Sequence, residues 1–152
     1  MKVKKILSMM LSVILVTNCI ISVALATDKT SILNLNELER DKIYAIVQDM
    51  TAVTTRASVN FEVDLEENSI SVMRNVKFPL EAGETVTINA SYSPFSASVD
   101  FGLIAPDGYF YYINVKNGSI NKTIRVDERG NYMLAVRNNS DDTVSVVGYV
   151  NY

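Results

Sequence analysis

The sequence predicts an all-β protein: an antiparallel β-sandwich of jelly-roll or Greek-key type with about eight strands, preceded by a signal peptide and a short amphipathic helix. From residue 57 onward, apolar and polar residues alternate with a period of two, which is typical of strands with one buried and one solvated face. Turn signals interrupt this alternation about every ten residues, as in sandwiches built from short strands. Residues 57–152 are therefore expected to form the sandwich domain.

The first 26 residues have the composition of a secretory signal peptide. Three lysines occur within the first five residues, and the apolar stretch that follows ends in Ala24-Leu25-Ala26. A basic start, an apolar middle and small residues before a cleavage site define such a signal, so we expect a secreted, extracellular protein that begins at Thr27 and has no stable membrane span. An uncleaved membrane anchor is the alternative, because the apolar stretch nearly reaches the roughly 20 residues that span a bilayer.

The chain that remains after cleavage lacks cysteine, histidine and tryptophan, because the one cysteine, Cys19, lies in the signal. This composition excludes Ser-His and Cys-His catalysis and the usual zinc sites, and no disulfide can stabilise the fold. Cleavage also removes three of the 14 basic residues, which leaves 11 against 17 acidic residues and a net charge of −6. An acidic domain is a poor candidate for binding nucleic acid or anionic membranes.

Residues 27–56 differ from the rest of the chain because they contain neither glycine nor proline. Four apolar residues recur there at the helical period: Ile43, Ile46, Val47 and Met50. This pattern predicts an amphipathic helix over residues 37–51, and the threonine-rich residues 51–56 that follow are expected to be a linker. The whole segment is a spacer, a pro-segment cut near Arg56, or a helix packed on the sandwich.

Eight strands are expected in the sandwich. They lie at residues 59–65, 69–78, 85–92, in the two arms of a hairpin at 98–115, and at 120–126, 132–137 and 143–152. Arg74 interrupts the apolar face of the second strand, so we expect a bulge or an edge there. The hairpin has the clearest turn signal: Pro106 sets φ, Asp107 can bond to nearby backbone, and Gly108 tolerates positive φ.

The C-terminal part of the chain also resembles a known family. The run Gly118-x-Ile120, Thr123-Ile124-x-Val126, Gly130-Asn131-Tyr132-x-Leu134-x-Val136 is similar to the end of bacterial pre-peptidase C-terminal β-sandwich domains. Residues 83–152 also resemble short secreted proteins of Gram-positive bacteria. The pre-peptidase C-terminal domains are accessory modules beside an enzyme, so the resemblance implies a β-sandwich with a non-catalytic role and transfers no active site.

Aromatic residues in the second hairpin arm suggest a binding surface. Alternation places Tyr109 and Tyr111 on the core face, whereas Phe110 and Tyr112 point away from it. Exposed aromatic rings can stack on sugars or anchor a protein, so the expected partner is an extracellular glycan or protein. The candidate ligand-binding residues are Phe110, Tyr112, Tyr92 and Phe95. The alternative is that a loop or the predicted helix covers this second face.

Carboxylates provide a second hypothesis, a small secreted hydrolase that works with or without calcium. Asp141 and Asp142, together with loop carbonyls, are the candidate calcium ligands. Most of the acidic residues lie in turns, where aspartate and glutamate are expected for local hydrogen bonding, and a solvated loop also accounts for this pair. We therefore expect a non-enzymatic binding module first, with no cofactor other than calcium.

Overall fold

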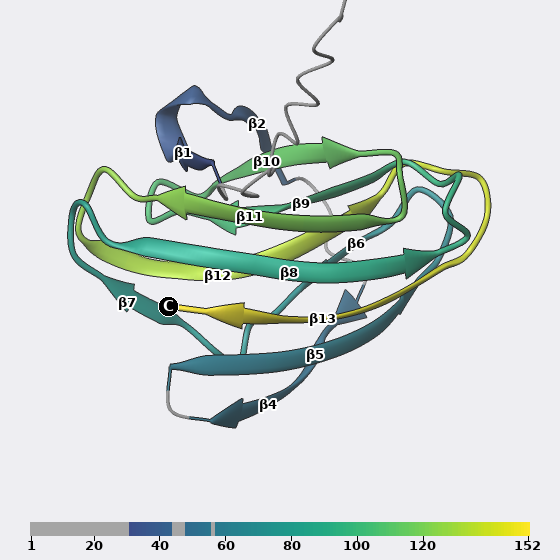
Figure 1. The fold of residues 1–152 in the computed structure, drawn as a ribbon, viewed down its shortest axis with the longest axis horizontal. Helices are drawn as coiled ribbons and strands as arrows, with labels where there is room; N and C mark the ends of the chain where they lie inside the picture. Colours follow the sequence, from purple (N-terminus) through teal and green to yellow (C-terminus); the bar gives the residue numbers. More distant parts are fainter. Residues whose placement is uncertain (1–30, 44–47, 56) are drawn as a thin grey trace, which may run out of the picture.

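Two mainly antiparallel sheets pack face to face as a β-sandwich in the computed structural model, which describes residues 31–43, 48–55 and 57–152 (Figure 1). The six-stranded sheet contains, in spatial order, β1 (Ile32–Asn34), β11 (Ser119–Arg125), β8 (Thr85–Ser93), β13 (Val144–Asn151), β5 (Ser58–Leu65) and β4 (Thr51–Thr55). The seven-stranded sheet contains β2 (Glu39–Lys42), β10 (Tyr109–Val115), β9 (Val99–Ile104), β12 (Gly130–Asn138), β6 (Ile70–Val72) and β3 (Gln48–Asp49), with β7 (Phe78–Leu80) paired to β12. The predicted fold class is confirmed.

The core lies between the two sheets and is filled by alternate residues of their strands. Tyr132, Phe78 and Phe101 are among its largest fully buried side chains. Tyr111 and Val115 belong to the same cluster, and Tyr109 and Ile113 pack against it while partly buried. The predicted core face of the second hairpin arm is therefore confirmed. Burial of one face fixes the register of each strand, because a slip by one residue would turn that face to solvent.

The hairpin turn between β9 and β10 forms as the sequence predicts. The Asp107 carboxylate accepts a hydrogen bond from the Tyr109 backbone N–H at 2.9 Å, and the Gly108 N–H donates to the Ala105 carbonyl at 2.9 Å. Gly108 has φ of +82°, which a residue with a Cβ adopts only at a cost. The turn residues therefore set which residues of the two arms pair.

The predicted strand at 69–78 is divided into β6 and β7. Arg74 lies between them, and its Nε is 3.5 Å from Asp49 Oδ1 in an ion pair that is about half exposed on both sides. Met73 is nevertheless fully buried in the core. Alternation gives Arg74 the face of Ile70 and Val72, which pack on the outer side of this sheet, so the chain leaves the ladder at a half-exposed charged residue.

The amphipathic helix predicted over residues 37–51 is wrong for the residues that the structure describes there. A 3-10 turn, η1 (Leu35–Glu37), is followed by β2, and β3 precedes β4. Met50 is buried in the main core, whereas Ile43 packs on the outer face of the seven-stranded sheet. Ile43 and Met50, which both fit the helical period, thus pack at two different sites. Pairing of β2 with β10 overrides the local helical pattern.

The linker predicted at residues 51–56 is also wrong, because residues 51–55 form β4 and pair antiparallel with β5. β-Branched residues favour strands, and three of these five residues are threonine. Residues 31–55 therefore contribute strands to both sheets. The predicted signal peptide and its cleavage site lie outside the described residues. Within the described ranges, no helix has the length and apolar character needed to cross a membrane.

Candidate ligand-binding surface

Phe110 lies on the outer face of the seven-stranded sheet, as alternation predicts, but its side chain is 0% exposed. It belongs to a small second cluster whose other buried members are Ile70, Val72, Ile104 and Ala135. Of the two alternatives for this face, the covered one therefore holds for Phe110. A strand's alternation assigns a residue to a face, whereas exposure depends on what packs on that face.

Tyr112 is half-buried and engaged by its neighbours. Its ring is stacked on Phe110 with 5.2 Å between the ring centroids, and the guanidinium carbon of Arg137 is 4.5 Å from its centroid. Burial raises the pKa of Tyr112 above its usual range, and the Arg137 guanidinium opposes this rise. Arg137 therefore covers part of the ring that was expected to meet a ligand.

The Arg137 guanidinium is itself held by two carboxylates. Its Nε and Nη2 donate to Asp100 Oδ2 at 2.8 and 2.7 Å, and its Nη1 donates to Asp41 at 2.8 Å. Asp100 is 1% exposed and also accepts hydrogen bonds from the side-chain amides of Asn114 and Asn139, at 2.6 and 2.8 Å. These five residues form the Asp100 network. The polar groups of the Asp100 network form hydrogen bonds with one another, so the network stabilises the sheet.

Tyr92 and Phe95 lie at one end of the six-stranded sheet. Tyr92 is buried, and its hydroxyl lies 3.1 and 3.0 Å from the carbonyl oxygens of Ala97 and Val115. Phe95 is 71% exposed and lies against Gly118. The four predicted aromatic candidates therefore do not form one site. Phe110 and Tyr112 lie on the outer face of the seven-stranded sheet, whereas Tyr92 and Phe95 line one hollow on the six-stranded sheet.

Asp141 and Asp142 lie in the loop between β12 and β13. Asp141 Oδ1 accepts a hydrogen bond from the Asn68 side-chain amide at 3.3 Å, and the Asp142 carbonyl accepts one from Asn138 at 2.7 Å. In the described part of the chain, no three acidic, histidine or cysteine side chains are grouped so that they could hold a metal ion. The pair's observed contacts tie the loop to its neighbours.

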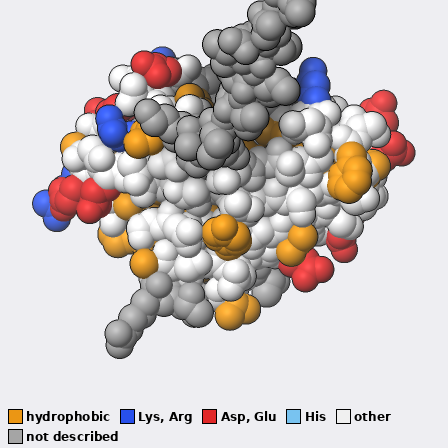
Figure 2. Space-filling view, in the orientation of Figure 1, with side chains coloured by type: hydrophobic (Ala, Val, Ile, Leu, Met, Phe, Trp, Pro, Cys, Tyr) orange, Lys and Arg blue, Asp and Glu red, His pale blue; other side chains and the backbone are white. Residues whose placement is uncertain are grey.

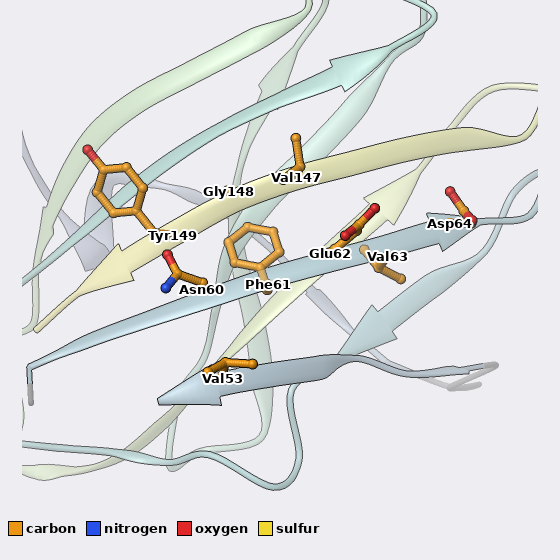
Figure 3. A pocket seen from close by; sticks show the side chains of 9 residues that line it. All are labelled: Val53, Asn60, Phe61, Glu62, Val63, Asp64, Val147, Gly148 and Tyr149. Atoms are coloured by element: carbon orange, nitrogen blue, oxygen red, sulfur yellow. The ribbon is translucent and has the colours of Figure 1, made fainter. Parts of the chain in front are cut away.

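A groove that sequence reasoning missed runs along the outer face of the six-stranded sheet. It has two hollows, of about 630 Å³ and about 210 Å³, which share Glu62 and Val147. The larger hollow lies over β4, β5 and β13 (Figure 3). Together they define the outer groove, lined by Val53, Asn60, Phe61, Glu62, Val63, Asp64, Ser91, Tyr92, Ser93, Phe95, Ser145, Val146, Val147, Gly148 and Tyr149.

Register explains how the outer groove is built. β13 pairs antiparallel with β5, which places Tyr149 opposite Asn60, Val147 opposite Glu62, and Ser145 opposite Asp64. Directly opposed side chains on one face of a sheet lie about 4.5 to 5.5 Å apart at Cβ. Figure 3 shows Tyr149 and Asn60 at one end of this row and Asp64 at the other. The alternation in both strands identified these residues as solvated, but only the sheet order makes them neighbours.

The outer groove is acidic and carries no positive charge. No basic side chain lines either hollow, and in the described part of the chain no cation pairs with Glu62. Asp64 accepts a hydrogen bond from the Ser145 hydroxyl. Figure 2 shows this side of the molecule largely in white, with most charged side chains toward its margins. The outer groove therefore presents two carboxylates, the Asn60 amide, serine hydroxyls and a few apolar side chains.

A separate polar cluster lies at the β2 edge of the other sheet. The Tyr111 hydroxyl donates to Asp107 Oδ2 at 2.7 Å and accepts from Arg40 Nη1 at 3.3 Å. The hydrogen bond to Asp107 raises the pKa of Tyr111, and burial adds to the rise. Arg40 also lies 5.2 Å from the Tyr109 ring centroid. These contacts hold the strand β2 against β10.

Three tyrosines should make the protein sensitive to alkaline pH. The pKa values of Tyr111, Tyr112 and Tyr132 are raised above 10.0, for Tyr132 mainly by burial. Because these pKa values are higher in the folded protein, the tyrosines of the unfolded chain lose their protons at lower pH. The free energy of unfolding should therefore stay constant below pH 10 and fall as pH rises through the pKa values of the folded protein. Urea unfolding on both sides of that pH measures this. Tyr111→Phe should weaken the decline, and stability that stays constant across this interval would contradict the prediction.

Comparison with known proteins shows the fold. No protein family model matches the chain, and no curated protein matches its sequence. The chain is similar to a periplasmic inhibitor of g-type lysozyme, PliG of Aeromonas hydrophila, with 13% identity over 70% of this chain and 96% of that chain and a TM-score of 0.51. A carbohydrate-binding module, CBM36, solved with calcium and xylotriose, aligns with 77% of this chain and 94% of its own at 8% identity and a TM-score of 0.34. The chain therefore shares a β-rich fold with the lysozyme inhibitor.

Proposed function

We propose that the protein is a secreted, non-enzymatic binding module that holds an extracellular ligand, a glycan or a protein, in the outer groove. The observation that carries this proposal is the groove itself: a hollow of about 630 Å³ on a rigid sheet, with Tyr149 38% exposed beside it. Ligand sites are typically concave and of about 300 to 1,000 Å³, with a few polar groups that fix orientation. The groove has both properties.

The acidic residues of the groove are poor catalysts in this setting. Glycoside hydrolysis uses two carboxyls in different environments, one of them usually held in an apolar pocket. Glu62 and Asp64 both lie on the exposed face of β5, with polar neighbours. Their place suits hydrogen-bond acceptance from a ligand. The hydrolase hypothesis therefore has less support than binding.

The similar fold of the lysozyme inhibitor agrees with a non-enzymatic role. That protein is described as an inhibitor of g-type lysozyme, so a sandwich of this kind can act by binding. The likeness does not select a ligand for this chain, but it supplies a defined protein probe. A g-type lysozyme therefore serves as the protein arm of the experiment.

The test combines retention with a search for reaction products. Protein expressed from the full sequence and recovered from the culture medium is passed over immobilised polysaccharides and over immobilised g-type lysozyme. We expect retention on one of these without release of sugars or peptides, and loss of retention in Tyr149→Ala, because an aromatic anchor contributes much of the energy of an interface. Ile32→Ala is the control, since Ile32 is an exposed apolar residue of the same sheet outside the groove.

Two results would contradict the proposal. Release of product from any substrate would make the protein an enzyme. Equal retention of Tyr149→Ala and the unchanged protein would place the binding surface outside the outer groove.

A further inference from the structure

We infer that the ligand of the outer groove is an uncharged linear glycan that lies along β13, with its sugar rings against Tyr149 and Phe95. This inference rests on the proposed function and names the class of ligand. It follows from the shape of the groove, its hydrogen-bonding groups and its charge.

The groove runs obliquely over β4, β5, β13 and β8, from Val53 and Tyr149 to Ser93 and Phe95. The two hollows meet at Glu62 and Val147, with Tyr149 in one and Phe95 in the other. Tyr149 and Ser145 are four steps apart along β13, or about 13 Å at about 3.3 Å per residue. Phe95 extends the groove beyond Ser93, which is opposite Ser145. A linear ligand of several units fits this space, with an aromatic ring near each end.

The side chains between the two rings match hydroxyl groups. Asn60 offers an amide that donates and accepts, and the hydroxyls of Ser91 and Ser93 do the same. A sugar hydroxyl also donates and accepts, so each of these groups can satisfy it. Glu62 can accept a charge-assisted hydrogen bond, which is stronger than a neutral one. Sugar rings also have apolar C–H faces, which Tyr149 and Val147 can cover.

The charge of the groove excludes anionic polymers. Glu62 and Asp64 lie on the same exposed face, and no basic side chain lines the groove to offset them. Carboxylates this close repel phosphates and uronic acids, and a cleft of one sign lowers the local concentration of like-charged ligands. An uncharged glycan meets no such repulsion.

A protein ligand fits the same surface less well. Protein interfaces have a desolvated centre in which tryptophan, tyrosine and arginine carry most of the energy. The centre of this groove is Glu62, Ser91 and Val147, and its two aromatic residues lie toward the ends. This distribution of polar and apolar side chains favours a chain of sugar rings.

The experiment titrates the labelled secreted protein by NMR with four neutral oligosaccharide series: cello-, xylo-, manno- and N-acetylchito-oligosaccharides of increasing length. Oligogalacturonate is the anionic probe and g-type lysozyme the protein probe. At least one neutral series should bind, with affinity that rises with length until the groove is filled, and should shift amide signals of β5 and β13. Oligogalacturonate should not bind.

Matched variants locate the site. Tyr149→Ala and Asn60→Ala should each weaken binding of the neutral oligosaccharide by about tenfold, the effect of about 1.4 kcal/mol. Asn121→Ala and Ile32→Ala change exposed residues of the same sheet outside the groove and should alter affinity by less than about twofold. Thermal unfolding of each variant confirms that it is folded, which the exposure of all four side chains leads us to expect.

The other outcomes separate this inference from the proposed function. Binding of lysozyme that Tyr149→Ala abolishes, with no neutral oligosaccharide bound, would overturn the glycan and leave a binding module. Tight binding of oligogalacturonate at the same residues would overturn the uncharged ligand. If neutral oligosaccharides bind but Tyr149→Ala and Asn60→Ala bind equally well, both the groove and its proposed ligand are wrong. No binding by any of the probes would overturn the glycan inference.

Discussion

Replacing Asp100 by alanine should lower the free energy of unfolding by about 3 kcal/mol. Asp100 is 1% exposed and accepts hydrogen bonds from three side chains, Arg137, Asn114 and Asn139, so its removal takes the acceptor from four nitrogen donors. Breaking a buried ion pair from one side typically costs about 3 to 5 kcal/mol, because the other charge stays behind. We expect the lower end, since the Arg137 side chain keeps a quarter of its surface exposed and still contacts Asp41. Urea unfolding measures the loss.

A double-mutant cycle separates the pair from its surroundings. Arg137→Met alone removes the other charge, and the combination with Asp100→Ala leaves no buried charge in the Asp100 network, because the remaining carboxylate, Asp41, is 48% exposed. The loss in free energy of unfolding of the double variant should therefore be smaller than the sum of the losses of the two single variants. Strict additivity, or a loss below about 1 kcal/mol in Asp100→Ala, would show that the Asp100 network contributes little to stability.

Gly102→Ala should destabilise the protein by more than about 3 kcal/mol, beyond the usual cost of overpacking. A Cβ at this position would lie 1.8 Å from the Tyr111 carbonyl oxygen and 2.7 Å from the Tyr112 Cα. Both atoms belong to the backbone of β10. This strand pairs with β9 through residues before and after Gly102, from Val99 to Ile104. Relief therefore requires the two strands to separate. Yield of folded protein and thermal unfolding report the effect.

Gly83→Ala provides the matched control. A Cβ at Gly83 would meet no atom within 4 Å, but its φ of +91° is unfavourable for alanine. That strain alone costs about 1 to 2 kcal/mol. Gly102→Ala should be clearly the less stable of the two, and similar melting of both variants would mean that β9 and β10 tolerate a side chain between them.

The sequence predicts the central strands well and the N-terminal strands poorly. In β5 and β8 one buried face imposes a strict period of two over a whole strand, so the pattern is visible without knowledge of the partner strand. β2, β3 and β4 are short edge strands, and β2 and β3 contain no apolar residue. The apolar residues beside them, Ile43 and Met50, pack at separate sites. The apolar residues of this segment therefore show no period of two. Met50 fits a helical pattern in the sequence, although it packs in the core of the sandwich.

The candidate site shows the same division between local and distant information. Alternation correctly separates Tyr111 from Tyr112, because it depends only on neighbours in the chain. The contacts that engage Tyr112 come from Arg137 on β12, which Asp41 on β2 helps to hold, and both residues are distant from the hairpin in sequence. The outer groove likewise forms only because β13 pairs with β5, and the local pattern of residues in either strand does not predict this pairing.

The place of β13 also has a kinetic consequence. The last strand of the chain lies in the interior of the six-stranded sheet, bonded to β8 on one side and to β5 on the other. β8 and β11 can pair once residue 125 has been synthesised, but this pair cannot be joined to β5 until β13 is also available. Folding then requires closure of long loops, and proteins dominated by such distant pairings fold in about milliseconds to seconds. The six-stranded sheet is therefore completed at its middle, and it cannot form in full before residues 144–151 are available.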